Sequence, residues 1–242
     1  GLQPKFGRHV RKRAGYLGGS PAERVEDLHA MFADREVAGI FCIRGGFGSA
    51  HLLDAIDYDL IRANPKVFLG YSDITALHLA IHARTRLVTL HGPVAVSRFT
   101  AYTQHCFRQA LFESKPLGKL TNPPDSDPLR PEHTLRAIVG GRARGRLIGG
   151  NLSLVASLMG TPFEIDTRGA ILFLEDVGEE PYAIDRMLTQ LRLSGKLAQA
   201  AGVIWGECAG CRPRSCEPSF DSTFSVGEVA DEILGKLKVP VL

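Results

Sequence analysis

The sequence lacks several features that would place it in a specialised class of protein. No apolar run approaches the roughly 18 residues of a membrane-spanning helix, and there is no signal-peptide core. The net charge of +3 over 242 residues is too small to favour nucleic-acid binding. Hydrophobic and charged residues, at 44% and 23%, are typical of globular proteins. We therefore expect a soluble, cytoplasmic protein that binds neither membrane nor nucleic acid.

The sequence also has few residues that could bind a metal together. Three of its five cysteines lie close in sequence, as Cys208-x-x-Cys211 followed by Cys216. A zinc site would need a fourth ligand, but no histidine lies beyond His133 and the other two cysteines are distant. We expect reduced thiols and no metal. His78 and His82 have the spacing of a zinc-binding pair, but without the usual glutamate between them we expect packed or hydrogen-bonded helix histidines.

Strand and helix patterns alternate along the chain. Short apolar runs typical of buried strands occupy residues 37–43, 67–70, 87–90, 170–174 and 201–205. Helical spacing or capping signals occupy residues 21–33, 49–56, 74–83, 102–113, 152–159, 181–193 and 226–237. Glycines at 140–141 between apolar segments suggest a hairpin over 135–148. The alternation predicts an α/β fold with a doubly wound, mainly parallel sheet, whose ligands gather at the carboxyl ends of the strands.

A turn at Ser72 is the most informative local feature. The strand at 67–70 runs through Tyr71, Ser72 and Asp73 into a helix. Such a turn exposes the serine hydroxyl and places the backbone N–H of Asp73 at a helix N-terminus, where it can help bind an oxyanion. The match is partial, because the sequence is Gly-x-Ser-Asp and not Gly-x-Ser-x-Gly. A Ser-Asp helix cap on an ordinary α/β unit is the alternative.

Two further segments could contribute to such a site. The loop Arg-Gly-Gly-Phe-Gly at 44–48 could cradle a phosphate or supply a second oxyanion donor to Ser72, although it could also be a plain glycine-rich turn. Glu175 ends an apolar strand, as does an acid that orients a catalytic histidine, although a surface acid at a strand end is the simpler interpretation.

Taken together, these segments make the chain resemble the LD-carboxypeptidase family of serine peptidases, which includes the microcin C immunity peptidases. The resemblance covers nearly the whole chain. It is carried by Arg-Gly-Gly-Phe-Gly at 44–48, Tyr-Asp-Leu-Ile-Arg-Ala-Asn-Pro at 58–65, Gly-Tyr-Ser-Asp-Ile-Thr at 70–75, His-Gly-Pro at 91–93, Gly-Gly-Asn-Leu at 149–152, Leu-Glu-Asp-Val at 174–177, Pro-Tyr at 181–182 and Asp-Arg at 185–186. It implies that Ser72 is the nucleophile and that Glu175 orients the histidine of a Ser-His-Glu triad.

The histidine of that triad departs from the family pattern. In the family it sits in a Gly-His pair shortly after a strand like Val-Pro-Val-Leu, and this sequence stops at Leu242. None of its eight histidines lies at the matching place. The first strand of the family's sheet would also precede residue 1. We therefore expect a fragment cut at both ends, and we expect the fragment itself to be inactive.

The resemblance also implies a domain organisation. We expect an N-terminal α/β nucleophile domain at 1–114, lacking its first strand, and a truncated, mixed α/β C-terminal domain at 135–242. A proline-rich linker would occupy 115–134. The active site would lie between the two domains.

The implied reaction is hydrolysis of the L,D-amide bond that releases terminal D-Ala from murein tetrapeptide during cell-wall recycling, by a homodimer without a cofactor. Backbone N–H groups of Gly46 and Asp73 would bind the oxyanion, and Asn151 would bind substrate. Two alternatives stay open. One is hydrolysis of peptidyl- or aminoacyl-adenylates, which a stacking tryptophan would favour, but the single tryptophan, Trp205, lies in an apolar run. The other is a non-catalytic ligand-binding domain that uses the Gly45-Gly46 loop and Asn151.

Overall fold

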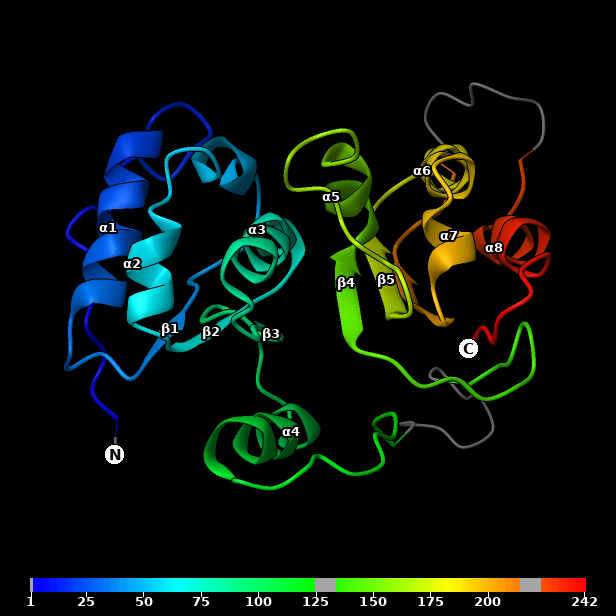
Figure 1. Ribbon diagram of the computed structural model, residues 1–242, viewed down its shortest axis with the longest axis horizontal. Helices are drawn as coiled ribbons and strands as arrows, with labels where there is room; N and C mark the ends of the chain where they lie inside the picture. Colours follow the sequence, from blue (N-terminus) through cyan, green and yellow to red (C-terminus); the bar gives the residue numbers. More distant parts are fainter. Residues whose placement is uncertain (1, 125–133, 214–222) are drawn as a thin grey trace.

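The chain folds into two α/β units that lie side by side, each built on a three-stranded parallel sheet (Figure 1). The structure is a computed structural model and describes residues 2–124, 134–213 and 223–242. The first sheet has the order β1 (Gly39–Phe41), β2 (Val67–Gly70), β3 (Leu90–His91). The second has the order β4 (Leu147–Asn151), β5 (Ile171–Val177), β6 (Gly202–Ala209). The predicted α/β class with parallel sheets is confirmed.

Helices connect the strands in both units. The first unit contains α1 (Pro21–Ala33), the 3₁₀ helix η1 (Ser49–Leu52), α2 (Tyr58–Ala63), the 3₁₀ helix η2 (Ser72–Ile74), α3 (Thr75–Thr85) and α4 (Ala101–Phe112). The second contains α5 (Leu152–Ser157), α6 (Pro181–Leu193), α7 (Lys196–Gln199) and α8 (Val226–Leu234). Within the described parts of the chain, none of these helices has both the length and the apolar character needed to cross a membrane.

Capping signals explain why two of these helices begin where they do. At α1, the Ser20 hydroxyl accepts from the Glu23 N–H while the Glu23 carboxylate accepts from the Ser20 N–H, and Pro21 fills the first turn. This reciprocal arrangement satisfies backbone donors that have no partner inside the helix. Ser225 and Glu228 repeat it at α8. The predicted bounds of α1 and α6, at residues 21–33 and 181–193, are confirmed.

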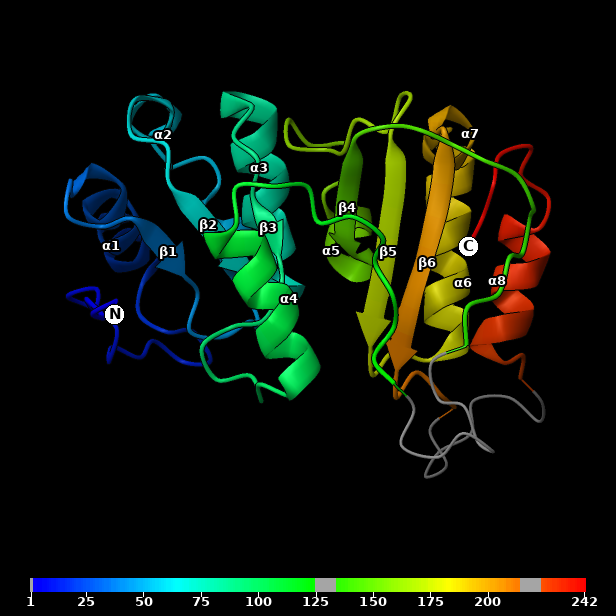
Figure 2. The ribbon, with the colours of Figure 1, turned by 90° about the horizontal axis from the view of Figure 1, so that it is seen from below.

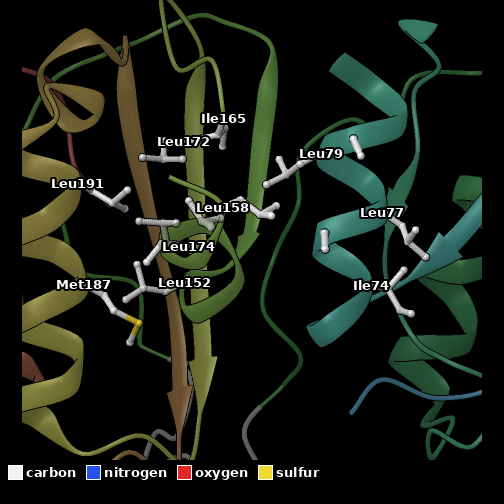
Figure 3. Close-up of a cluster of buried hydrophobic side chains, with 14 of the residues drawn as sticks. Ile74, Leu77, Leu79, Leu152, Leu158, Ile165, Leu172, Leu174, Met187 and Leu191 are labelled. Atoms are coloured by element: carbon white, nitrogen blue, oxygen red, sulfur yellow. The ribbon is translucent and has the colours of Figure 1, made fainter. Parts of the chain in front are cut away.

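Helix α3 joins the two units. Its residues from Thr75 to Ile81 are all buried, which is the pattern of a helix covered on every side. It contacts β4 and α5 of the second unit, and the two sheets flank this junction (Figure 2). Figure 3 shows Leu77 and Leu79 on α3, and Leu152, Leu172 and Leu174 on the second unit; all five belong to one apolar cluster. The ends of β2, β3, β4 and β5 are therefore held together by a shared core.

Several sequence predictions need correction. The hairpin predicted at 135–148 is wrong: Val139 instead pairs antiparallel with Val241, which also forms a parallel bridge to Val203 of β6. The helix predicted at 49–56 is the short 3₁₀ helix η1. Strand β5 runs on to Val177, so Glu175 lies inside the strand and not at its end. The boundaries of the expected linker are not tested, and residues 125–133 within it lie outside the described residues.

A substitution at Gly149 on β4 tests how closely β4 packs against β5. The φ of Gly149 is +138°, and a Cβ there would lie 1.8 Å from the Phe173 carbonyl oxygen on β5. We expect Gly149→Ala to lower the free energy of unfolding by about 3 kcal/mol, because backbone strain adds to a clash with backbone. Gly227→Ala, on the exposed first turn of α8, is the matched control and should change it by less than about 1 kcal/mol. Urea denaturation measures the free energy of unfolding of both variants. Equal unfolding midpoints for the two variants would contradict the expected clash at position 149.

Candidate active site

Ser72 occupies a strained turn at the carboxyl end of β2. Its φ is +63°, and among the described non-glycine residues only Arg86 shares this left-handed conformation. The side chain of Ser72 is half-buried. For a residue with a Cβ this conformation is unfavourable by about 1 kcal/mol, so the surrounding structure must hold it in place. Strained turns of this kind are concentrated at functional sites.

The glycines near Ser72 let the chain approach it closely. A Cβ on Gly45 would lie 3.0 Å from the Ser72 Cβ and 3.2 Å from its Oγ. A Cβ on Gly70 would lie 2.9 Å from Ile74 Cγ2. Gly46 has a φ of +123°, and its neighbour Gly45 packs directly on the serine. The loop at 44–48 is therefore next to Ser72, and binding of an oxyanion by its N–H groups stays a prediction.

The carboxylate of Asp73 anchors this loop from behind. Its Oδ2 accepts hydrogen bonds from the Ser49 N–H at 2.9 Å and from the Ser49 hydroxyl at 2.7 Å, and both residues are buried. Arg24 donates from Nη1 to the Gly48 carbonyl at 2.9 Å, and burial lowers the pKa of its guanidinium. The sequence indicated only the backbone N–H of Asp73 as functional. Its side chain fixes the geometry of η1 and η2 relative to each other.

Glu175 reaches the same region from the second unit. It is the partner of Asn151 in the β4–β5 register, and its Oε1 lies 3.8 Å from Nε2 of His91 at the end of β3. That separation is too long for a hydrogen bond. Oε1 is buried and, in the part of the chain that the structure describes, has no hydrogen-bond partner.

Burial dominates the titration of both groups. It raises the pKa of Glu175 to about 7, with a further increase from the carboxylate of Asp176 and an opposing effect of the Asn151 amide. It lowers the pKa of His91 to about 4, with a smaller contribution from His78. At neutral pH His91 is therefore an uncharged imidazole beside a carboxyl group that is close to its titration midpoint.

Asn151, the predicted substrate-binding residue, is buried among protein partners. Its backbone N–H donates to Thr75 Oγ1 at 3.0 Å, its Nδ2 donates to Asp176 Oδ1 at 3.0 Å, and its Oδ1 accepts from the Leu154 N–H at 3.1 Å. The Asp176 carboxylate also accepts from the N–H and hydroxyl of Ser153. These bonds tie α3, β4 and β5 together, and a role of Asn151 in substrate binding stays a prediction.

The other candidate residues take structural positions. His78 donates to the Gly70 carbonyl at 2.8 Å and His82 bonds to the Leu87 carbonyl at 3.3 Å, which confirms the prediction of hydrogen-bonded helix histidines. Cys208 and Cys211 are unpaired thiols, and burial raises the pKa of both. Cys216 lies outside the described residues. Among the described residues there is no group of three ligating side chains that could hold a metal.

The predicted site residues thus come from both units: Ser72, Asp73 and the glycine loop from the first, and Glu175 from the second. Among the described residues, no histidine is hydrogen-bonded to the Ser72 hydroxyl. The partners Ser49 and Thr75 were not foreseen, because a lone hydroxyl gives no sequence signal before its tertiary neighbours are known. One feature of the sequence could have indicated His91 as a functional residue. It lies at the carboxyl end of a strand, which is the edge where parallel sheets place their functional residues.

Comparison with known proteins identifies the family of the chain. Residues 1–92 match the LD-carboxypeptidase N-terminal domain, and residues 144–242 match the LD-carboxypeptidase C-terminal domain. The chain belongs to the LD-carboxypeptidase family. The chain is 48% identical to the "Probable murein peptide carboxypeptidase" of Bacillus subtilis, over 91% of its own length and 67% of the relative's.

More distant relatives match over a similar extent. The "Murein tetrapeptide carboxypeptidase" of Pseudomonas aeruginosa is 34% identical to the chain, over 96% of the chain and 76% of the relative. A solved structure of microcin C7 self immunity protein MccF in complex with aspartyl sulfamoyl adenosine superposes with a TM-score of 0.81, at 27% identity, over 98% of this chain and 75% of that one. The chain thus spans about two thirds to three quarters of the length of these relatives.

Proposed function

We propose that this protein hydrolyses the L,D-amide bond of murein tetrapeptide and releases terminal D-Ala, with Ser72 as nucleophile. The observation that carries the proposal is the strained conformation of Ser72 at the end of β2, with the glycine loop packed on its side chain. The names of the two curated relatives support the murein substrate. Gly46 and Asp73 would donate their N–H groups to the oxyanion, each contributing about 3 kcal/mol to the transition state.

The proposed reaction has two steps. Ser72 Oγ attacks the scissile carbonyl while a histidine takes its proton, and the histidine then gives that proton to the departing D-Ala amine. Water, activated by the same histidine, hydrolyses the acyl-enzyme and restores the Ser72 hydroxyl. Glu175 would hold the imidazole in the required tautomer. We propose that this histidine belongs to the part of the relatives that this chain does not span, because no described histidine is hydrogen-bonded to the Ser72 hydroxyl and the chain spans 67% and 76% of the length of two relatives.

Hydrolysis of an aminoacyl-adenylate is the second candidate, and the structural similarity to MccF favours it. Against it stands the position of Trp205, the single tryptophan. It lies within β6, where its backbone N–H donates to the Leu242 carbonyl at 2.8 Å. A tryptophan inside a strand is not on a loop that could fold over an adenine ring.

An assay of the two substrates decides between these functions. It requires a version lengthened at both ends to match the relatives, called here the extended protein. We expect it to release D-Ala from murein tetrapeptide with a kcat/KM at least about tenfold above its kcat/KM for an aspartyl-adenylate, a preference of about 1.4 kcal/mol. Chromatographic detection of D-Ala and of adenosine monophosphate measures the two reactions. Hydrolysis of the adenylate alone would reject the murein assignment, and hydrolysis of neither would favour a binding domain.

A further inference from the structure

Glu175 carries a buried carboxylate oxygen that no described residue satisfies. Among the described residues, buried Oε1 has no hydrogen-bond partner, whereas Asn151 on the adjoining strand β4 is bonded through both its backbone N–H and its Nδ2. A buried acceptor without a donor is unfavourable by about 1–3 kcal/mol, so a native structure rarely leaves one unused. The nearest ring nitrogen that faces this oxygen is Nε2 of His91, at 3.8 Å.

His91 is held in position for that contact. It is the last residue of β3, and its ring is in edge contact with Phe173, with 5.3 Å between centroids, and with Tyr71, with 6.2 Å. Gly150 makes room for it: a Cβ at that position would lie 3.2 Å from His91 Nδ1 and 2.6 Å from Thr75 Oγ1. The imidazole, whose side chain is 25% exposed, therefore lies at the junction of the two units, with its Nε2 3.8 Å from Glu175 Oε1 on β5.

We propose that His91 is a positioning residue, which donates its Nε2–H to Glu175 Oε1 across the junction of the two units. The inference rests on the proposed function, because it assigns Glu175 the task of orienting the triad histidine. A small rotation of the carboxylate brings the two atoms to a hydrogen-bond distance of about 3 Å. Hydrogen bonds of catalytic groups are often long in unliganded enzymes and shorten when substrate binds. One oxygen of Glu175 would then hold His91, and the other would remain for the triad.

The surrounding charges favour a neutral donor at this place. The titratable groups that face Glu175 are His91 from β3 and Asp176 from its own strand, and His78 of α3 lies behind His91 with 6.3 Å between ring centroids. The Asp176 carboxylate is already bonded to Asn151 and Ser153, so it repels Glu175 without donating to it. His91 is uncharged at neutral pH, and its Nε2–H stabilises the ionised form of Glu175.

Two substitutions separate this role from simple packing. His91→Phe keeps a ring against Phe173 and removes the donor, whereas His91→Gln places an amide N–H where Nε2 was. We expect His91→Phe to raise the pKa of Glu175 by about one unit, because the ionised form loses a hydrogen bond, and His91→Gln to change it by less than half a unit. Carboxyl ¹³C NMR, with Glu175→Gln for assignment, follows this titration in the 242-residue protein.

The same variants in the extended protein give the kinetic readout. We expect His91→Phe to lower kcat for D-Ala release about tenfold with little change in KM. We also expect it to shift the acidic limb of the pH–rate profile to higher pH. The glutamine variant, His91→Gln, should retain nearly the wild-type kcat. Equal Glu175 titration in the wild-type protein and both variants would overturn the proposal, as would failure of the glutamine to rescue. Complete loss of activity in both variants would instead make His91 the base and would also overturn it.

A measurement on the unaltered protein covers the case in which His91→Phe does not fold. The ¹⁵N shifts of the His91 ring report which nitrogen carries the proton, and we expect a neutral ring protonated on Nε2 at pH 7. A ring protonated on Nδ1 alone would overturn the proposal. Neither NMR measurement needs turnover, so each decides the role of His91 even if a Ser72→Ala variant proves active and the proposed function fails.

Discussion

A Ser72→Ala variant of the extended protein is expected to release D-Ala from murein tetrapeptide on the order of 10⁴-fold more slowly than the unaltered protein. The hydroxyl would form the acyl-enzyme, and no other described side chain of the glycine-loop site can replace it. The residual activity would come from the backbone N–H groups that stabilise the oxyanion and from binding of the substrate. Trapping with a slow substrate, followed by mass spectrometry, should find one acyl adduct, on Ser72.

The substitution should leave the fold intact, which separates loss of chemistry from loss of structure. Alanine keeps the Cβ, so the strain at a φ of +63° is unchanged, and the Ser72 hydroxyl is not a helix cap. We expect the free energy of unfolding to change by less than about 1 kcal/mol. Ser157→Ala, at an exposed hydroxyl in α5, is the matched control and should retain full activity. Near wild-type turnover in Ser72→Ala would exclude Ser72 as the nucleophile.

The 242-residue protein is expected to release D-Ala more than about 10³-fold more slowly than the extended protein. Because no imidazole in the described part of the chain is hydrogen-bonded to the Ser72 hydroxyl, that hydroxyl stays protonated at neutral pH and is a weak nucleophile. Parallel assays of the two proteins, each checked for folding by circular dichroism, measure the difference. A fragment that is folded but slow would show that the base is missing and not the scaffold.

Comparable rates from the two proteins would contradict this account. A histidine within the 242 residues would then serve as the base, and His91 would be the first to examine because it already faces Glu175. Glu175→Gln is the accompanying control in the extended protein: it keeps the shape of the side chain but removes the negative charge that stabilises an imidazolium. We expect it to lower kcat substantially, with KM nearly unchanged.

The sequence by itself determined the features that depend on neighbours along the chain. The bounds of α1 follow from the local Ser20–Glu23 capping box, and the turn at Ser72 follows from an apolar strand running directly into a helical pattern. The parallel α/β class follows from the alternation of strands and helices, because parallel strands need a crossover between them. Ordered motifs also sufficed to indicate the family, since their order is a property of the chain alone.

Tertiary structure decided the features that depend on residues far apart in the sequence. Asp73 bonds to Ser49, Asn151 bonds to Thr75 and Asp176, and Glu175 faces His91, and no local pattern specifies which partner a polar side chain will meet. The prediction of a hairpin at 135–148 was wrong for the same reason: Val139 pairs with Val241, about a hundred residues away in the sequence. The pKa values of His91 and Glu175 are likewise consequences of burial, which exists only once both units have packed around α3.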